Sequence, residues 1–489
     1  MAVQRLSALC DVTGPARRPA YEPADHGTGI VHLGLGAFHR AHQAVATDDA
    51  LAAHGGNWRI VPVSLRSREA SEALNAQNGL YTLIERGPGG ISGRVVGAIS
   101  HGIGADPAAT LKALRDPAIR IVTLTVTEKG YGIDRATHGP DWNHDAVAAD
   151  RKAPDAPVGV LGLLTAAIKA RRDAGSVPLT ILSCDNLPEN GALLRAGVVG
   201  FARALDEDLA RFIESEITFP SSMVDRITPA ATAQTLAEAE RLTGCTDLAA
   251  IETEPFTQWV IEDRFPNGRP YWEAGGAIFV ENVAPYERMK LTMLNGTHSM
   301  LAYAGFLSGH AYVRDVMGDP VLAALVERHL KAAALEVGDL PGIDLSAYAG
   351  DLAERFRNPA IAHATYQIAM DGTEKLPQRI FAPALCALRA GRDLSTYAFA
   401  TAAWTRYALG TDEAGNAYSL RDPKENLIVA RLADAERNAG SIMTALLALP
   451  GFAPQELTVD PNWRAAVESR LAAMLTHGMT EAVRREAAA

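Results

Sequence analysis

Three polar residues in the segment PYERMKLTMLNGTHSMLAYAG have the types that the oxidation of an alcohol requires: Lys290, Asn295 and His298. The segment is predicted to form one helix. Because successive helical residues are separated by about 100°, His298 lies about 80° and Asn295 about 140° round the axis from Lys290. One wide face can therefore present all three. The same trio also suits a surface lysine, a capping asparagine and a structural histidine, so the spacing leaves both interpretations open.

Oxidation of a secondary alcohol to a ketone needs a base for the hydroxyl proton. Lys290 can supply it if desolvation or neighbouring cations lower its pKa from the usual value of about 10.4. Amide donors from Asn295, and from Asn186 at the end of the run LTILSCDN, can stabilise negative charge on the reacting oxygen. His298 can orient a neighbouring hydroxyl. Glu287, three residues before Lys290, can relay its proton or form an ordinary surface ion pair.

A glycine turn follows the apolar run IVHL near the N-terminus. Gly34 and Gly36 match the first two glycines of a dinucleotide fingerprint, while His39 stands in the place of the third. The first glycine permits a tight turn, and the second lets the backbone approach a pyrophosphate at the start of the following helix. A glycine pair after a strand is also common without any ligand, so this motif is weak by itself.

The next strand-like run, RIVPVSL, continues into Arg66, Ser67 and Arg68 before the first acid, Glu69. An acidic residue at the end of this strand binds the adenosine ribose in NAD enzymes. Two arginines and a serine can instead accept a ribose phosphate, or can simply be a solvated strand end. The cofactor choice is therefore open, with NADP as an alternative to NAD.

Alternating strand and helix patterns surround these motifs. Further strand-like runs at 119–128 and 177–186, with helical stretches between them, predict an α/β fold with a parallel sheet covered by helices. From about Pro285 the pattern changes to long amphipathic stretches rich in Ala and Leu. We therefore expect a Rossmann-type dinucleotide-binding domain over 1–284 and a mainly helical substrate and catalytic domain over 285–489.

The composition excludes several classes of function. A chain of 489 residues is too long for one ordinary core. The net charge of −11 includes no basic block, which argues against nucleic acid and for a small-molecule partner. The four cysteines lie far apart with no metal-binding spacing. No apolar run is long enough for a membrane span and no signal pattern opens the chain, so a cytoplasmic protein that does not bind membranes is expected.

Seven segments together resemble the mannitol 2-dehydrogenase family of long-chain polyol dehydrogenases, and they occur in the family's order over nearly the whole chain. They are GLGAFHRAHQA, TLTVTEKGY, LSCDNLPENG, FPSSMVDRITP, EPFTQWVIEDRF, NGRPYWE and PYERMKLTMLNGTHS. The resemblance implies a Rossmann-type N-terminal domain, a mostly helical C-terminal domain, a nicotinamide cofactor, no metal and a monomer.

The resemblance also implies roles for individual residues. It assigns the catalytic base to Lys290, the oxyanion-stabilising amides to Asn186 and Asn295, substrate orientation to His298 and proton passage to Glu287. The residues expected to contact the cofactor are Gly34, Gly36, Phe38 and Arg66. The residues expected to contact substrate are Val224, Asp225, Gln367, Lys375 and Arg379. Asp225 can equally pair with Arg226 or stabilise a turn.

Gln367 replaces an arginine that contacts polyol in mannitol-specific members, which favours the fructuronate reductase branch. The expected reaction is the reversible reduction of D-fructuronate to D-mannonate by NADH, with Lys375 or Arg379 facing the carboxylate, unless both are plain surface charges. The alternatives are a mannitol 2-dehydrogenase that interconverts D-mannitol and D-fructose, and an arabinitol or altronate dehydrogenase. A non-catalytic sugar or nucleotide sensor is disfavoured because the Lys, Asn and His set is complete.

Overall fold

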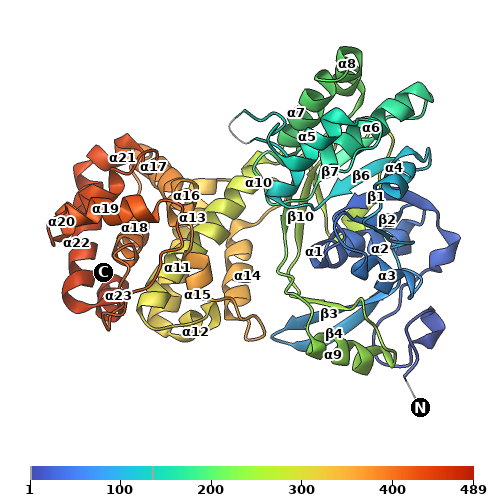
Figure 1. Ribbon diagram of the computed structural model, residues 1–489. Helices are drawn as coiled ribbons and strands as arrows, with labels where there is room; N and C mark the ends of the chain where they lie inside the picture. The colour runs from blue at the N-terminus through green and yellow to red at the C-terminus, as the bar shows by residue number, and fades with distance from the viewer. Residues whose placement is uncertain (1–2, 135–136) are drawn as a thin grey trace. The chain divides into compact units, whose positions relative to one another are not determined.

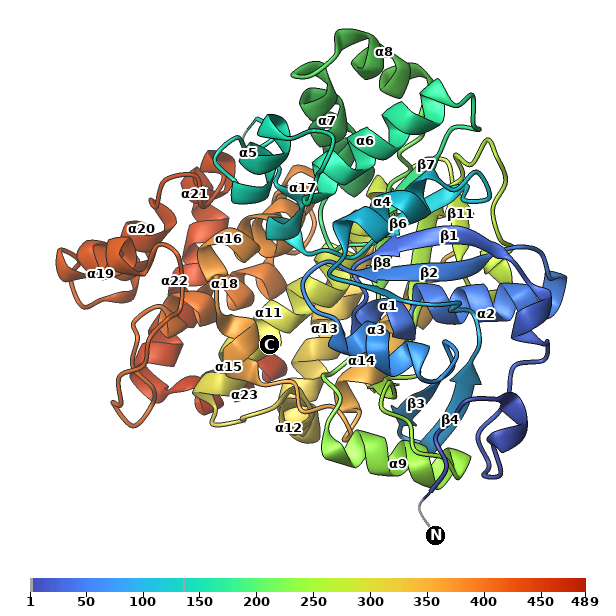
Figure 2. The same ribbon diagram turned by 45° about the vertical axis from the view of Figure 1, so that its right-hand side comes forward.

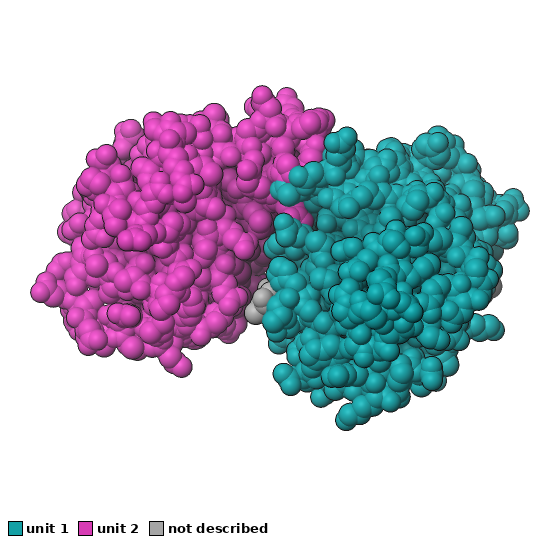
Figure 3. All heavy atoms as spheres, turned by 90° about the horizontal axis from the view of Figure 1, so that it is seen from above, with its two compact units in different colours: residues 1–284 teal, residues 285–489 magenta. Residues whose placement is uncertain are grey.

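The computed structural model describes residues 3–134 and 137–489 and divides the chain into two compact units, Met1–Ala284 and Pro285–Ala489 (Figure 3). Each unit is built from a different kind of layer. All the named strands lie before residue 281, and from Pro285 onward the described elements are helices. The amphipathic Ala- and Leu-rich patterns of the sequence predict this change from strands and helices to helices alone.

The predicted parallel sheet forms the centre of the first unit and has five strands. In spatial order its strands are β5 (Ile103–Gly104), β2 (Arg59–Ser64), β1 (Thr28–Leu33), β6 (Ile121–Leu124) and β7 (Thr180–Ser183). The strands read as nearly continuous Val, Ile and Leu runs because both faces of a parallel sheet are covered. The chain order reverses between β1 and β6, which pair in parallel and bring Leu33 opposite Leu124. In such sheets ligands bind outside the carboxyl ends of the strands at this reversal.

Helices cover both faces of this sheet (Figures 1 and 2). One face buries Val31 and Leu33 against the core that contains α4 (Pro107–Arg115) and α6 (Val160–Asp173). The other buries Ile30 in a separate core with α1 (Ala37–Ala41) and α2 (Gln43–His54). The remaining helices of this unit are α3 (Glu69–Asn75), α5 (Asp145–Lys152), α7 (Asn190–Arg203), α8 (Glu207–Glu216) and α9 (Ala233–Thr243).

Two small sheets complete the first unit. In one, β3 (Tyr81–Gly87) lies between β4 (Gly90–Val96) and β9 (Ile251–Thr253). In the other, β10 (Gln258–Glu262) lies between β11 (Ile278–Val280) and β8 (Ser222–Asp225). The second of these matters for the predicted site because β8 carries Val224 and Asp225, paired in antiparallel register with β10.

The second unit is built around α11 (Gly296–Leu307), in which every residue except Phe306 is buried. A helix that is apolar all round must lie inside the protein, and α11 packs against α13, α15 and α18. The surrounding helices are α12 (Val313–Gly318), α13 (Pro320–Val337), α14 (Leu345–Arg357), α15 (Thr365–Ala369), α16 (Gly372–Leu376), α17 (Ala382–Arg389), α18 (Ser395–Tyr407), α19 (Glu425–Ala433), α20 (Ala439–Leu447), α21 (Gln455–Val459), α22 (Pro461–His477) and α23 (Met479–Ala488). The short helix α10 (Ala284–Met289) leads from the first unit into the second.

Two stretches of the second unit are π-helical, Lys290–Asn295 and Pro377–Phe381. Among the described residues, every helix is too short or too polar to cross a bilayer.

Candidate functional site

The glycine turn is held tightly against the ends of two neighbouring strands. Gly34 has a φ of +112°, and a Cβ atom at this position would lie 2.0 Å from the carbonyl oxygen of Thr125. Its N–H donates to the carbonyl of Val63, 2.9 Å away. Only glycine fits this conformation and this close approach. Gly36, in contrast, would bring a Cβ no nearer than 3.7 Å to another atom.

A cavity of about 350 Å³ opens beside this turn at the carboxyl ends of β1, β2 and β6. Its lining residues are Gly34, Leu35, Gly36, Ser64, Leu65, Arg66, Thr125, Val126, Thr127, Gly130, His144, Ala146, Val158, Gly159 and Val160. The exposed side chain of Arg66 is at its edge, whereas Phe38 is not among the lining residues and stacks on His42 with 5.0 Å between ring centroids. The glycine cradle, the strand ends and the place in the sheet all fit a dinucleotide.

Asn186 follows β7 and is exposed. The residue before it, Asp185, accepts hydrogen bonds from the N–H of Val126 and from the Tyr131 hydroxyl, each at 2.8 Å. Burial, and then the Asp185 charge, raise the pKa of Tyr131, so this phenol stays protonated as a donor. Asp185 therefore ties together the loops after β6 and β7 and positions Asn186. Asp185 is not among the residues predicted from the sequence, although it directly precedes Asn186 in the run LTILSCDN.

Val224 and Asp225 are buried at the end of β8. The neighbouring Arg226 forms an ion pair with Glu85, at 2.6 Å, and donates to the carbonyl oxygens of Ala41 and Glu254. Arg226 thus links three segments of the first unit. The ion pair with Glu85 gives Arg226 a structural role.

The helix that carries Lys290 differs from the predicted regular α-helix. From Lys290 to Asn295 it is π-helical, and the N–H of Gly296 donates to the carbonyl of Leu291, five residues back. In a π-helix the hydrogen bonds join residues five apart, so residues five apart lie nearly above one another, as residues four apart do in an α-helix. The expected angle of about 140° between Lys290 and Asn295 is therefore an overestimate, and the two residues lie more nearly on one side of the helix.

Close packing accompanies the π-helical turn. A Cβ atom on Gly296 would lie 2.7 Å from the carbonyl oxygen of Arg379, which belongs to the second π-helical stretch. Lys290 is 7% exposed, Asn295 is half-buried and Glu287 lies one turn earlier in α10, also half-buried. The amine of Lys290 is thus largely withdrawn from bulk water, as its predicted role as a base requires.

His298 is buried in surroundings that favour its neutral form. Its ring lies 4.5 Å from that of Phe356 and 5.2 Å from that of His363, measured between centroids. Burial lowers the pKa of His298 well below its usual value, and the nearby His363, Arg355 and Arg379 lower it further. A neutral imidazole offers one donor and one acceptor nitrogen, which suits a hydroxyl group.

Lys375 and Arg379, the two cations proposed to bind a substrate carboxylate, have different contacts. The Nζ atom of Lys375 donates to the carbonyl oxygens of Met370 at 2.6 Å and Ile368 at 3.3 Å, and lies 3.5 Å from the Asp371 carboxylate. For the half-buried Arg379, the one side-chain hydrogen bond within the described part of the chain is a long contact, 3.4 Å from Nη1 to the hydroxyl of Ser299.

Burial lowers the pKa of both Lys375 and Arg379. An arginine stays charged all the same, so Arg379 is a partly buried cation whose donors are little used. Gln367 is exposed on α15.

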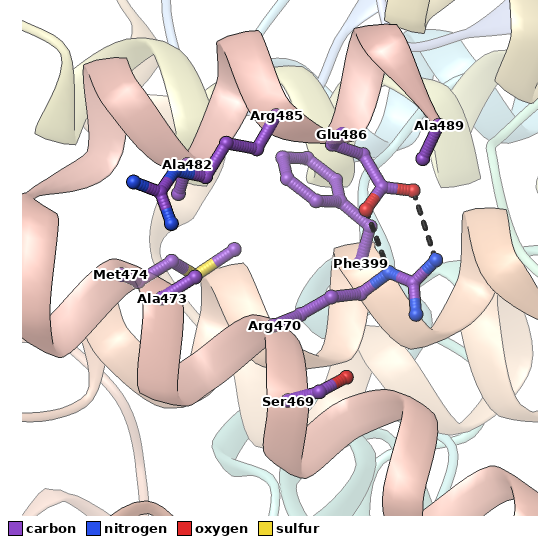
Figure 4. A pocket seen from close by; sticks show the side chains of 9 residues that line it. All are labelled: Phe399, Ser469, Arg470, Ala473, Met474, Ala482, Arg485, Glu486 and Ala489. Atoms are coloured by element: carbon purple, nitrogen blue, oxygen red, sulfur yellow. Dashed lines mark hydrogen bonds and ion pairs between the residues drawn. The ribbon is translucent and has the colours of Figure 1, made fainter.

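Two other cavities lie in the second unit and contain none of the predicted site residues. One, of about 230 Å³, is lined by Phe399, Ser469, Arg470, Ala473, Met474, Ala482, Arg485, Glu486 and Ala489 (Figure 4). There Glu486 forms ion pairs with Arg470 at 2.8 Å and Arg328 at 2.6 Å. These ion pairs give the buried Glu486 a structural role that accounts for its place in this cavity. The other is a groove between α13 and α14. Over residues 3–134 and 137–489, no group of three or more His, Cys, Asp or Glu residues could hold a metal ion.

Comparisons with known proteins agree with this architecture. The model of the mannitol dehydrogenase Rossmann domain matches residues 28–274, and that of the mannitol dehydrogenase C-terminal domain matches residues 282–475. The chain is 39% identical to the D-mannonate oxidoreductase of Escherichia coli, over 98% of this chain and 99% of that protein. It is 38% identical to the mannitol 2-dehydrogenase of Cereibacter sphaeroides, over 94% and 97%.

Among solved structures, the ternary complex of Pseudomonas fluorescens mannitol 2-dehydrogenase with NAD and D-mannitol matches with a TM-score of 0.80 and 36% identity, covering 99% of each chain. Both domain models, the full-length relatives and this fold agree with one another. The chain belongs to the mannitol dehydrogenase family of oxidoreductases.

Proposed function

We propose that this oxidoreductase reduces the ketone of a linear sugar acid to a secondary alcohol, and that its substrate pair is D-fructuronate and D-mannonate. The observation that carries the proposal is the partly buried Arg379 guanidinium, whose one side-chain bond within the described residues is the long contact to Ser299. Ser299 directly follows His298, which is proposed to bind substrate hydroxyls. A cation with unused donors suits a substrate with a carboxylate, because bidentate arginine–carboxylate pairs are among the stronger hydrogen-bonded contacts.

The contacts of Lys375 make it the weaker candidate for that carboxylate. Two of its three donors already go to carbonyl oxygens and its charge is partly balanced by Asp371. We therefore assign carboxylate recognition to Arg379 and a supporting role to Lys375. Val224, Asp225 and Gln367 remain predicted substrate contacts.

The chain's own residues would manage the proton and the oxygen. In reduction, Lys290 as an ammonium gives a proton to the oxygen of the reacting carbonyl, and in oxidation its neutral amine removes the proton from the hydroxyl. The amide of Asn295 donates to this oxygen while it carries negative charge, and Asn186 keeps its predicted role as an oxyanion-stabilising amide. Glu287 passes the proton between Lys290 and water. His298 orients the neighbouring hydroxyl.

A nicotinamide dinucleotide, when bound, supplies or accepts the hydride. Gly34, Gly36 and Arg66 would hold it at the cavity beside β1, β2 and β6. Phe38, which lies on α1, remains a predicted cofactor contact. The related mannitol 2-dehydrogenase complex contains NAD, and we propose NAD for this chain. NADP is the alternative, because Arg66 lines the cavity and no acid stands at the end of β2.

Turnover of purified protein tests the proposal. Oxidation of NADH and NADPH is followed with D-fructuronate, D-tagaturonate and D-fructose under identical conditions, and D-fructuronate is expected to have the highest kcat/KM. An Arg379→Met variant should lose about 10- to 150-fold in kcat/KM for D-fructuronate, the equivalent of one hydrogen bond to a charged group, and little for D-fructose. Lys375→Met is the matched control and should lose less.

Mannitol 2-dehydrogenase activity is the second candidate, since the identities to the two kinds of relative, 39% and 38%, are nearly equal. Preference for D-fructose, with no selective effect of Arg379→Met, would establish that activity and remove the assigned role of Arg379. Dinucleotide binding without turnover of any of these substrates would favour a sensor.

A further inference from the structure

Two histidines stack directly beneath the glycine turn. His32 lies on β1 and His39 on α1, and both side chains are fully buried. Their ring centroids are 3.5 Å apart and their planes differ by 10°. This is a face-to-face contact between a central strand and the first helix after the turn. It lies on the face of the sheet that buries Ile30 with α1 and α2.

His32 also binds the turn itself. Its Nδ1 lies 2.7 Å from the hydroxyl of Thr123, and its Nε2 lies 2.8 Å from the hydroxyl of Thr125 and 3.1 Å from the carbonyl oxygen of Gly34. The Thr125 hydroxyl donates to that same carbonyl at 2.9 Å. Because a carbonyl only accepts, Nε2 carries the proton, and Nδ1 accepts from Thr123. Gly34 and Thr125 both line the cavity assigned to the dinucleotide.

His39 stands where the fingerprint has its third glycine. That glycine normally lets the helix approach the strand closely. Here the space between helix and strand is filled by two flat rings in contact. Neither ring nitrogen of His39 makes a hydrogen bond of normal geometry with a described residue, although the Gln43 side chain lies nearby, so we assign its contribution to the shape of the ring.

We infer that His32 and His39 form one positioning unit that replaces the third glycine and holds the turn in the shape that receives the pyrophosphate of the dinucleotide. His32 fixes the Gly34 carbonyl through hydrogen bonds, and His39 fixes His32 through the stack. Neither residue lines the cavity, so both act through Gly34 and Thr125. The inference rests on the proposed use of a nicotinamide dinucleotide.

Four variants separate the ring from its nitrogens. His32→Phe keeps a ring for the stack and removes both hydrogen-bonding atoms, and His32→Gln restores a donor near the place of Nε2. His39→Phe keeps the ring, whereas His39→Leu removes it. We expect the Kd for NADH, from protein fluorescence, to rise about 10-fold or more in His32→Phe, equivalent to one or two lost hydrogen bonds. A similar rise is expected in His39→Leu, because without the stacked ring His32 no longer keeps its hydrogen bonds to the turn. The Kd should change less than threefold in His39→Phe, and lie between the wild-type and His32→Phe values in His32→Gln.

The melting temperature identifies variants that fold, and kinetics distinguish positioning from general damage. Variants that fold should show a raised KM for the dinucleotide, with kcat and the KM for the sugar substrate unchanged. Wild-type protein that binds neither NADH nor NADPH would contradict the proposed function itself. Wild-type protein that binds, together with folded His32→Phe and His39→Leu variants that bind within twofold of it, would overturn the positioning unit. A His39→Phe variant as weak as His39→Leu would also overturn it.

Discussion

Acid should destabilise the second unit through His329 on α13. This side chain is fully buried, and neither ring nitrogen has a hydrogen-bond partner in the part of the chain that the structure describes. Its nearest aromatic neighbour is Tyr397, with ring centroids 5.7 Å apart. Burial lowers the pKa of His329 to about 3. The substitution to make is His329→Leu, which introduces an apolar side chain of similar size and removes the titrating group.

The sign follows from the proton balance. In the unfolded chain a histidine has a pKa of about 6.5, so below that pH the unfolded state binds a proton that the folded state does not. The free energy of unfolding is therefore unaffected by the titration of His329 above about pH 6.5. It falls progressively as the pH drops from about 6.5 toward about 3. Each pH unit in this window lowers the free energy of unfolding by about 1.4 kcal/mol, so at pH 5 it is lower by about 2 kcal/mol.

Calorimetry of the whole chain at pH 7 and pH 5 measures the effect. For a domain of this size 1 kcal/mol corresponds to about 2–4 °C in melting temperature. The transition of the second unit should therefore fall about 4–8 °C further in wild-type protein than in His329→Leu. The exposed His477 of the same unit supplies the control, since His477→Gln should behave like wild type. Equal acid shifts in wild type and His329→Leu would refute the reasoning.

Three other predictions concern the site and the first unit. Lys290→Met should lower turnover by about 10²- to 10⁴-fold, the usual contribution of general acid–base catalysis, with an unchanged Kd for NADH in a fluorescence titration; near-normal turnover would exclude this base. Gly34→Ala should abolish NADH binding and lower the melting temperature of the first unit, because the new Cβ would lie 2.0 Å from a carbonyl oxygen, whereas Gly36→Ala should leave that temperature unchanged. Arg171→Met should cost the first unit about 3 kcal/mol in urea unfolding, because Arg171 donates to four carbonyl oxygens of its surroundings; a loss below about 1 kcal/mol would contradict its structural role.

The amino-acid sequence was sufficient for the fold class and for the family. Strands β1, β2, β6 and β7 were predicted from nearly continuous apolar runs, because a strand covered on both faces must be apolar throughout. The conformation at Gly34 was predicted because a tight turn after a strand selects glycine locally. The helical second half followed from periodicity, and the family from the order of seven segments. Each of these signals lies within a short stretch of chain.

Several features that define the candidate site depended on the tertiary structure. The π-helical turn from Lys290 to Asn295 is accompanied by the approach of Gly296 to the Arg379 carbonyl, more than eighty residues away, and helical periodicity contains no signal for such a contact. The contrast between Lys375 and Arg379 is equally invisible in the sequence, since both are simply cations near the end of one short segment.

The stacked histidines show the same division. His32 and His39 are seven residues apart, yet their roles depend on Thr123 and Thr125, which reach the turn because β6 pairs with β1. Asp185 likewise acts on Val126 only because β7 pairs with β6. Local patterns determine which elements form, because they reflect burial and backbone preference along the chain. Only strand pairing and helix packing decide which distant side chains meet, because those contacts join residues that the sequence separates.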